Sequence, residues 1–338
     1  MNATIYYKNI FGDNKMTKYK ILEILRENKD NFISGEILSR KLNVSRTAVW
    51  KGIKSLKEKG YLIEGINNKG YRLTEDNKNI LSEYEIKKNI KGKELGKNIF
   101  CFEKIDSTNT YIKLNSSLLK HGDIVIADEQ TKGRGRMEKV FYSPKESGIY
   151  MSVLFKKNIF YDSLKLLSIA SFISVCRGIE KCTGFSPNLT WNDINISGKK
   201  ICGILTECSL EGESGRVEYS IVGIGINANN SFFPKNIKDK TTSLKLELGK
   251  EVKRTELIGE IINEMEKLIC GRRYISERKN ILEEYTKRLS LLNKKVEIKF
   301  PEKKIIGKVT GINDLGGLII LKENGKKEII YTGELSHI

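Results

Sequence analysis

Hydrophobic residues recur at helical spacing in the first part of the chain. Residues 18–27 place their apolar side chains on one broad face, which predicts a helix. A second, shorter helix is predicted to begin after Ser34, a good N-cap residue, and to end at Leu42. Ser45 is predicted to cap a third helix, in which apolar residues again recur every three or four positions.

Strand-like alternation follows the third predicted helix. Residues 61–64 and 71–73 predict the two strands of a β-hairpin, with glycines in the turn between them. Three helices and a hairpin predict a winged helix-turn-helix, whose third helix enters a major groove of DNA. Winged helices also dock proteins, and a lysine-rich helix face is often only solvated, so both alternatives stay open.

The end of the chain changes to short strands. Glycine-containing turns separate four predicted strands, at residues 295–298, 308–312, 318–321 and 328–331. No apolar run reaches the roughly 18–20 residues that span a bilayer. The first 15 residues lack the continuous apolar segment of a secretory signal. We therefore expect a cytoplasmic protein with no membrane partner.

The net charge of the chain indicates which classes of partner are possible. The chain carries 60 Lys and Arg against 42 Asp and Glu, a formal net charge of +18. Such a surplus permits nucleic acid or an acidic protein as partner without choosing between them. In the predicted winged helix, Arg46 and Thr47 begin the third helix and are expected to meet base edges, whereas phosphate contacts are expected from Lys51, Lys54 and Lys69.

The six cysteines give no sign of a metal centre. None of them forms a C-x-x-C pair, and the chain has only two histidines. A zinc site is therefore not expected. Reduced thiols in the cytosol are the default expectation.

The strongest chemical signal is a Gly-Arg alternation within residues 129–136, directly after an apolar run. Gly133 and Gly135 are expected to turn the backbone at positive φ and to bring it close to a ligand. Arg134 and Arg136 add two permanent forked cations, so the loop is suited to a phosphate or a carboxylate. By itself the pattern is equally compatible with a solvated basic turn between strands.

Several further motifs occur in a fixed order with this loop. They are Asp106-Ser107-Thr108-Asn109, Ser143-Pro144, Gly148 to Ser152, Asn192-Asp193, Gly198 to Glu207, Val222 to Asn227, Phe233-Pro234 and Thr242-Ser243-Leu244. Together with the winged helix, this ordered set resembles the bifunctional biotin–protein ligase and biotin-operon repressor family, from about residue 18 to the C-terminus.

The resemblance implies an α+β multidomain fold. A tail (1–15) would precede the winged helix-turn-helix (16–75) and a linker (76–92). The ligase domain (93–290) would have a mixed sheet of the class II synthetase-like type, and an SH3-like β-barrel (291–338) would follow.

The resemblance also implies the chemistry and the partners. ATP and Mg²⁺ would convert biotin to biotinyl-5′-AMP, and biotin would pass to a lysine of a biotin carboxyl carrier protein. With biotinyl-5′-AMP as corepressor, a homodimer would bind operator DNA, because a palindrome needs two copies at a fixed spacing. The basic loop would close over biotin as a gate.

Roles for individual residues come from the same resemblance. Lys200, Arg136 and Asp193 would be catalytic. The biotin site would consist of Ser107, Thr108, Asn109, Gln130, Gly133, Arg134, Arg136, Lys200, Gly223 and Gly225. The nucleotide would meet Arg134, Arg136, Asn192 and Asn227, with Asp193 as a ligand for Mg²⁺. The alternative for Lys199 and Lys200 is an ordinary exposed turn.

Two departures from the family pattern leave room for other functions. Met137, Glu138 and Lys139 stand where the family has an arginine, a glycine and a further arginine. The family's Lys-Trp-Pro before Asn192 is Leu189-Thr190-Trp191 here, so either Trp191 takes the place of the proline or the tryptophan is kept and one residue is deleted. A biotin-sensing repressor with impaired ligation is the alternative function. A lipoate-type ligase is a weaker one, because lipoate has no ureido group for Gln130 and the Ser-Thr-Asn motif to bind.

Overall fold

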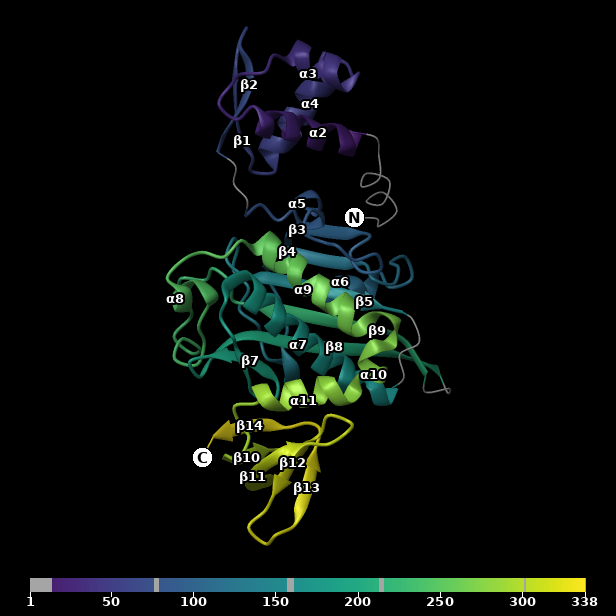
Figure 1. Cartoon of the computed structure of the whole chain (residues 1–338), viewed down its shortest axis with the longest axis vertical. Helices are drawn as coiled ribbons and strands as arrows, with labels where there is room; N and C mark the ends of the chain where they lie inside the picture. The colour runs from purple at the N-terminus through teal and green to yellow at the C-terminus, as the bar shows by residue number, and fades with distance from the viewer. Residues whose placement is uncertain (1–13, 76–78, 157–160, 213–215, 301, 338) are drawn as a thin grey trace. The chain divides into compact units, whose positions relative to one another are not determined.

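The computed structural model describes residues 14–75, 79–156, 161–212, 216–300 and 302–337 (Figure 1). Contacts divide the chain into two compact units, Met1–Glu85 and Ile86–Ile338. Most of the predicted tail, residues 1–13, lies outside the described residues. The predicted linker region contains a short helix, α5 (Glu83–Lys87).

The first unit contains the three predicted helices and the predicted hairpin. The helices are α2 (Asn14–Glu27), α3 (Gly35–Leu42) and α4 (Arg46–Glu58), and the strands are β1 (Leu62–Ile66) and β2 (Gly70–Glu75). Both predicted N-caps are confirmed, because Ser34 Oγ accepts a hydrogen bond from the backbone of Ile37 and Ser45 Oγ accepts one from Ala48. The two strands pair in antiparallel fashion.

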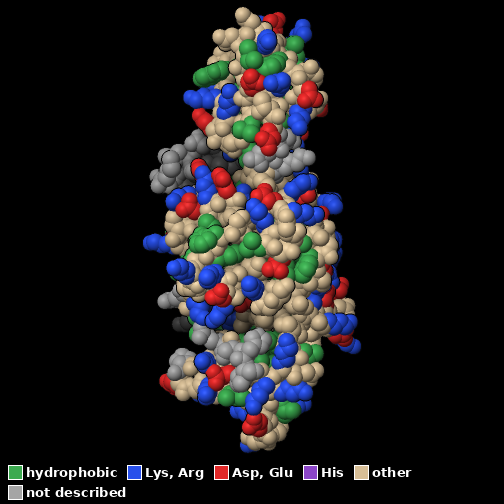
Figure 2. Space-filling view, turned by 90° about the vertical axis from the view of Figure 1, so that its left-hand side faces the viewer, with side chains coloured by type: hydrophobic (Ala, Val, Ile, Leu, Met, Phe, Trp, Pro, Cys, Tyr) green, Lys and Arg blue, Asp and Glu red, His purple; other side chains and the backbone are tan. Residues whose placement is uncertain are grey.

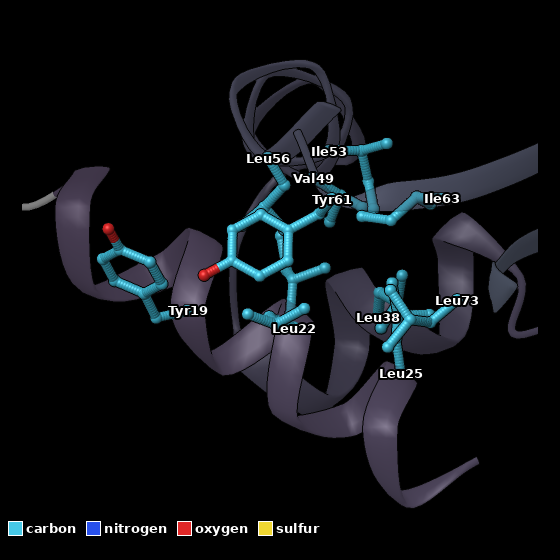
Figure 3. Close-up of a cluster of buried hydrophobic side chains, with 11 residues drawn as sticks. Tyr19, Leu22, Leu25, Leu38, Val49, Ile53, Leu56, Tyr61, Ile63 and Leu73 are labelled. Atoms are coloured by element: carbon cyan, nitrogen blue, oxygen red, sulfur yellow. The ribbon is translucent and has the colours of Figure 1, made fainter. Parts of the chain in front are cut away.

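One hydrophobic core holds these elements together. Figure 3 shows side chains from all three helices and from the hairpin pointing toward one another. Leu22 and Leu25 of α2, Leu38 of α3 and Leu56 of α4 are completely buried, and Leu73 of β2 closes the core from the hairpin. The helical periodicity of the sequence therefore identified the faces that pack inward.

The second unit is built on a seven-stranded mixed sheet with the order β3-β4-β5-β9-β8-β7-β6. Its strands are β3 (Ile99–Ile105), β4 (Ile124–Gln130), β5 (Ile149–Phe155), β6 (Asn188–Leu189), β7 (Asp193–Ile196), β8 (Lys199–Glu211) and β9 (Arg216–Ile226). Only the β3–β4 pair is parallel. The mixed sheet that the family resemblance implied for this region is confirmed.

Two long helices lie across this sheet (Figure 1). They are α7 (Leu164–Thr183) and α9 (Arg254–Ile269), and both bury most of their residues. The shorter helices are α6 (Thr108–Leu114), α8 (Leu244–Leu248), α10 (Arg273–Ser276) and α11 (Arg278–Arg288). No described helix is long and apolar enough to cross a bilayer.

A small antiparallel sheet of five strands forms the C-terminal part, in the order β13-β12-β11-β10-β14. The strands are β10 (Lys295–Lys299), β11 (Lys304–Ile312), β12 (Leu318–Leu321), β13 (Lys327–Ile330) and β14 (Glu334–His337). The four predicted strands are confirmed. The fifth, β14, was missed because its four residues show no marked apolar alternation.

Candidate active site and DNA-binding face

Three glycines lie in the middle of the large sheet and leave one face of it without side chains there. Gly203 lies opposite Gly225, and Gly223 lies opposite Ser152 of β5, so all of them share one face. A Cβ atom on Gly223 would lie 2.2 Å from Asn109 Oδ1, and one on Gly225 would lie 2.7 Å from the Phe141 ring. We call Gly203, Gly223 and Gly225 the glycine shelf, because their lack of side chains lets these groups approach the sheet.

Neutral polar side chains gather at the Gly223 end of the shelf. Thr108 and Asn109 begin α6 and are buried, and Ser152 Oγ lies 2.6 Å from Thr108 Oγ1 and 2.5 Å from Asn109 Oδ1. The backbone N–H of Thr108 donates to Gln130 Oε1 at 2.9 Å. Ser107 caps the helix, with its hydroxyl 3.5 Å from the Thr110 nitrogen. Four predicted biotin-site residues thus meet, joined by Ser152.

Glu207 connects this neutral group with the basic loop. Its Oε2 accepts hydrogen bonds from Asn109 Nδ2 at 2.6 Å and from Arg134 Nη2 at 2.9 Å. No role for Glu207 was inferred from the sequence. The period of two along β8 was the available signal, because it places Glu207 on the same face as Gly203.

The basic loop folds back as a tight turn. The backbone N–H of Phe141 donates to Gly133 O at 2.9 Å, and the N–H of Gly135 donates to Lys139 O at 2.6 Å. The expectation of positive φ at the glycines is wrong. Met137 has the positive φ of 52° in this turn, whereas Gly135 is extended with φ of −111°. Gly133 does provide close approach, because a Cβ there would lie 2.5 Å from Phe141 O.

Lys200 lies where a strand begins beside the shelf. It is the second residue of β8, and its Nζ lies 2.7 Å from Asp193 Oδ1. Its backbone bonds to the carbonyl of Lys240 and to the N–H of Thr242, which fixes the position of the strand end. Lys199 is exposed, whereas Lys200 is half-buried. The alternative of one ordinary exposed turn does not describe Lys200.

Arg136 lies on the Trp191 side of the Lys200–Asp193 pair. Its guanidinium carbon is 5.9 Å from the centre of the Trp191 ring. Burial lowers the pKa of Arg136, while the negative charge of Asp193 opposes this shift. Arginine remains protonated over the physiological pH range. Arg136, Lys200 and Asp193, the three predicted catalytic residues, therefore lie in one region.

The predicted nucleotide residues behave differently from one another. Asn192 is partly exposed next to Asp193. Asn227 is 3% exposed, and its Nδ2 donates to Thr242 O at 3.1 Å. The Asn227 amide thus holds Thr242, whose backbone also bonds to Lys200. The structure does not bring the Asn227 side chain together with Arg136 and Lys200.

The described residues contain no group of three or more His, Cys, Asp or Glu that could hold a metal ion. Asp193, the predicted Mg²⁺ ligand, has Lys200 as its neighbour. A magnesium ion here would therefore take most of its ligands from phosphate oxygens and water, as Mg²⁺ commonly does in nucleotide sites.

The predicted DNA-binding residues lie on α4 and on the hairpin turn. Thr47, Lys51, Lys54 and Lys69 are exposed, as the prediction requires. The ammonium of Lys54 lies 5.6 Å from the centre of the exposed Trp50 ring.

Arg46 differs from the other predicted DNA-binding residues, because it pairs with Glu36 at 2.6 Å. On the face shown in Figure 2, Lys and Arg side chains are spread among Asp and Glu. The net charge alone therefore does not mark the DNA face.

Three family models match separate parts of the chain. An HTH domain family matches residues 17–72, the biotin/lipoate A/B protein ligase family matches residues 101–227, and the biotin protein ligase C terminal domain matches residues 291–337. These matches follow the helical unit, the glycine shelf with its surroundings, and the small C-terminal sheet.

Known proteins are similar over nearly the whole chain. The bifunctional ligase/repressor BirA of Bacillus subtilis is 34% identical over 320 residues, which cover 93% of this chain and 97% of that protein. BirA of Escherichia coli is 28% identical over 309 residues, or 90% of this chain and 92% of that protein. The structure of the Aquifex aeolicus biotin protein ligase in complex with biotin and ATP has a TM-score of 0.61 and 31% identity, covering 71% of this chain and 98% of that one.

Proposed function

The chain belongs to the bifunctional biotin–protein ligase and biotin-operon repressor family, and from this premise we propose that it is an ATP-dependent biotin–protein ligase that also represses biotin genes. As a ligase it forms biotinyl-5′-AMP and transfers biotin to a lysine of a biotin carboxyl carrier protein. As a repressor it binds operator DNA with biotinyl-5′-AMP as corepressor.

One observation supports the ligase proposal above the others. The glycine shelf has neutral hydrogen-bonding groups at its Gly223 end and the Lys200–Asp193 pair beside Gly203. Biotin has the same polarity, with a neutral ureido ring at one end and a carboxylate at the other. Thr108, Asn109 and Gln130 are assigned to the ureido ring, since a buried polar group left unpaired costs about 1–3 kcal/mol.

The first chemical step joins two anions. The biotin carboxylate attacks the α-phosphorus of ATP, the bond from this phosphorus to the bridging oxygen breaks, and pyrophosphate leaves. Lys200 and Arg136 are assigned to offset the negative charge that gathers in the transition state. Arg134 and the backbone of Gly133 hold the basic loop over the ligand and exclude water from the mixed anhydride.

The second step transfers the acyl group. The amine of the carrier lysine attacks the biotinyl carbonyl carbon, and AMP leaves with the electron pair of the broken bond to oxygen. Asp193, which pairs with Lys200, and the neighbouring Asn192 are assigned to receive the amine proton and to orient the phosphate. When bound with ATP, Mg²⁺ would neutralise charge on the phosphate oxygens, with Asp193 as its protein ligand.

The finer architecture forms part of the proposal. The helical unit, residues 16–75, is assigned as a winged helix-turn-helix, and residues 76–92 as the linker. Residues 93–290 form the ligase domain, of class II synthetase-like type, and residues 291–338 form an SH3-like barrel. We assign the protein to the cytoplasm and its repressor form to a homodimer, because two copies of α4 read the two halves of a palindrome.

Biotin transfer to a purified carrier domain tests the ligase. Labelled biotin, ATP and Mg²⁺ are incubated with the full chain and the carrier, and a carrier lysine-to-arginine variant serves as the matched control. Label on the wild-type carrier alone is the expected result. Tight binding of biotin without transfer would instead identify a sensor-repressor with impaired ligation, and preference for lipoate would identify the related acyl ligase.

Operator binding tests the repressor. We expect biotinyl-5′-AMP to strengthen binding of the full chain to DNA from upstream of biotin genes, compared with a scrambled duplex. Lys51→Ala removes a phosphate contact, so the salt dependence of log K should weaken by about one unit of slope. Thr47→Ala should change base preference instead. Equal affinity for operator and scrambled DNA would contradict this part of the proposal.

A further inference from the structure

Trp191 has an unusual environment next to the active site. Its side chain is 1% exposed, yet its indole Nε1 has no hydrogen-bond partner among the described residues. Its backbone carbonyl accepts a hydrogen bond from Tyr285 Oη at 2.7 Å, so α11 holds the backbone at this position. A buried N–H donor with no acceptor is rare in proteins and indicates that a ligand or water completes it.

Two cations lie against this ring. Arg136 is 5.9 Å from the ring centre, and Lys165 Nζ is 5.4 Å from it. Lys165 is the second residue of α7, and a turn of the C-terminal sheet packs on it, because a Cβ on Gly316 would lie 2.9 Å from Lys165 Cγ. Among the side chains that the structure describes, no carboxylate lies within ion-pair distance of Lys165. An anion would therefore relieve the repulsion between the two cations.

The order of the strands indicates which part of the substrate would lie near Lys165. Neutral groups meet the sheet at β5 and β9, Lys200 lies on β8, Asp193 begins β7, and Trp191 lies between β6 and β7. Across the sheet, Trp191 therefore lies on the far side of Lys200 from the neutral groups. In an in-line displacement the leaving group lies opposite the attacking oxygen, so it lies beyond the α-phosphate on this side.

We propose that Lys165, Arg136 and the indole N–H of Trp191 together bind the β- and γ-phosphates of ATP and hold the pyrophosphate as it leaves. This assignment rests on the proposed function and adds Lys165 and Trp191 to its site. Trp191 stands where the resemblance expects proline or the preceding tryptophan, and here it supplies both a donor and a surface for two cations.

Pyrophosphate and tripolyphosphate are the probes that test this site. Lys165→Met removes the charge at similar length, Lys165→Arg retains it, and Trp191→Phe keeps a ring but removes the N–H. Three quantities are measured on the full chain: KM for ATP in adenylate formation, KM for pyrophosphate in the reverse reaction, and the Kd of tripolyphosphate by calorimetry. The Kd of biotin reports binding elsewhere in the site, and Tm reports folding.

We expect Lys165→Met to weaken ATP and pyrophosphate by at least about tenfold, because charged hydrogen bonds are the strong ones. Lys165→Arg should recover most of this, Trp191→Phe should lose less, and the Kd of biotin should change less than twofold. Unchanged polyphosphate affinity in a folded Lys165→Met protein would overturn the assignment. Wild-type protein that makes no adenylate would contradict the proposed function instead, and the tripolyphosphate titration would still decide the assignment.

Discussion

At the scale of single residues, Lys200 and Asp193 form an ion pair, and a substrate that binds Lys200 has to replace this contact. Both side chains are about one-third exposed, and their 2.7 Å contact lies beside the shelf. A pair that is this accessible to water contributes little to stability, at most about 1 kcal/mol. Either side chain can therefore leave the pair and bind a substrate with little loss of stability.

Lys200→Ala should separate binding from chemistry. We expect adenylate formation to fall by about 100- to 1,000-fold, because a positioned donor to developing charge is lost. The affinity for biotin should change only a few-fold, since the neutral groups lie elsewhere on the shelf. Pyrophosphate release measures the first quantity and calorimetry the second. Lys199→Ala, at an exposed neighbouring position, is the matched control, and normal pyrophosphate release in Lys200→Ala would exclude this role.

Lys165 should make ATP use depend on pH. Burial, and to a smaller extent the charge of Arg136, lowers the pKa of Lys165 to about 8. Below this value the ammonium is charged and attracts phosphate, whereas above it the amine is neutral. With Arg136 charged throughout, we expect kcat/KM for ATP to fall between pH 7 and 9. Lys165→Arg should remove this part of the profile, and identical profiles for the two proteins would count against it.

At the scale of elements, the hydroxyl of Ser45 fixes where α4 begins. Ser45→Ala should destabilise the first unit by about 1 kcal/mol, because the Ala48 N–H loses its acceptor. Hydrogen exchange of the α4 amides measures this loss, and we expect it to accelerate several-fold. Ser45→Asp keeps an acceptor and should exchange at close to the wild-type rate. Equal exchange in all three proteins would show that the cap is dispensable.

Local rules explain which elements could be predicted from the sequence. The caps at Ser34 and Ser45 and the hairpin depend on a few adjacent residues, so the pattern was sufficient. The turn of the basic loop was assigned to the wrong residues, because positive φ occurs at Met137 and not at the glycines. The Gly133–Phe141 and Gly135–Lys139 hydrogen bonds close the turn, and Met137 lies at its tip, where no glycine marks the position in the sequence. Strand β14 lacked a pattern, and it pairs with β10, which lies far earlier in the chain.

At the scale of the whole molecule, the sheet order assembles the site from segments far apart in sequence. Asn109, Arg134 and Glu207 meet although 98 and 73 residues separate Glu207 from its partners. The motifs could be identified from the sequence by resemblance. Their contacts could not, because neither the order β5-β9-β8-β7 nor its register is encoded in any local pattern.

Deleting residues 1–75 should remove DNA binding and leave ligation in place. The first unit has its own hydrophobic core, and the shelf with all its surrounding groups belongs to the second unit. We expect the shortened chain to biotinylate the carrier within a few-fold of the wild-type rate and to show no preference for operator DNA. Gel-shift and transfer assays on the same preparation measure both. Retained operator affinity would contradict the assignment of the helical unit.

The glycine shelf also determines which residues could be changed to alter the selectivity of the site. Gly223 and Gly225 have no side chain to exchange, and any replacement adds atoms where Asn109 and Phe141 already lie. The glycine shelf therefore offers a designer no adjustable position. Selectivity for a different acid would have to come from the buried side chains beside the shelf, such as Thr108 and Ser152, which can vary in size and polarity while the glycines stay constant.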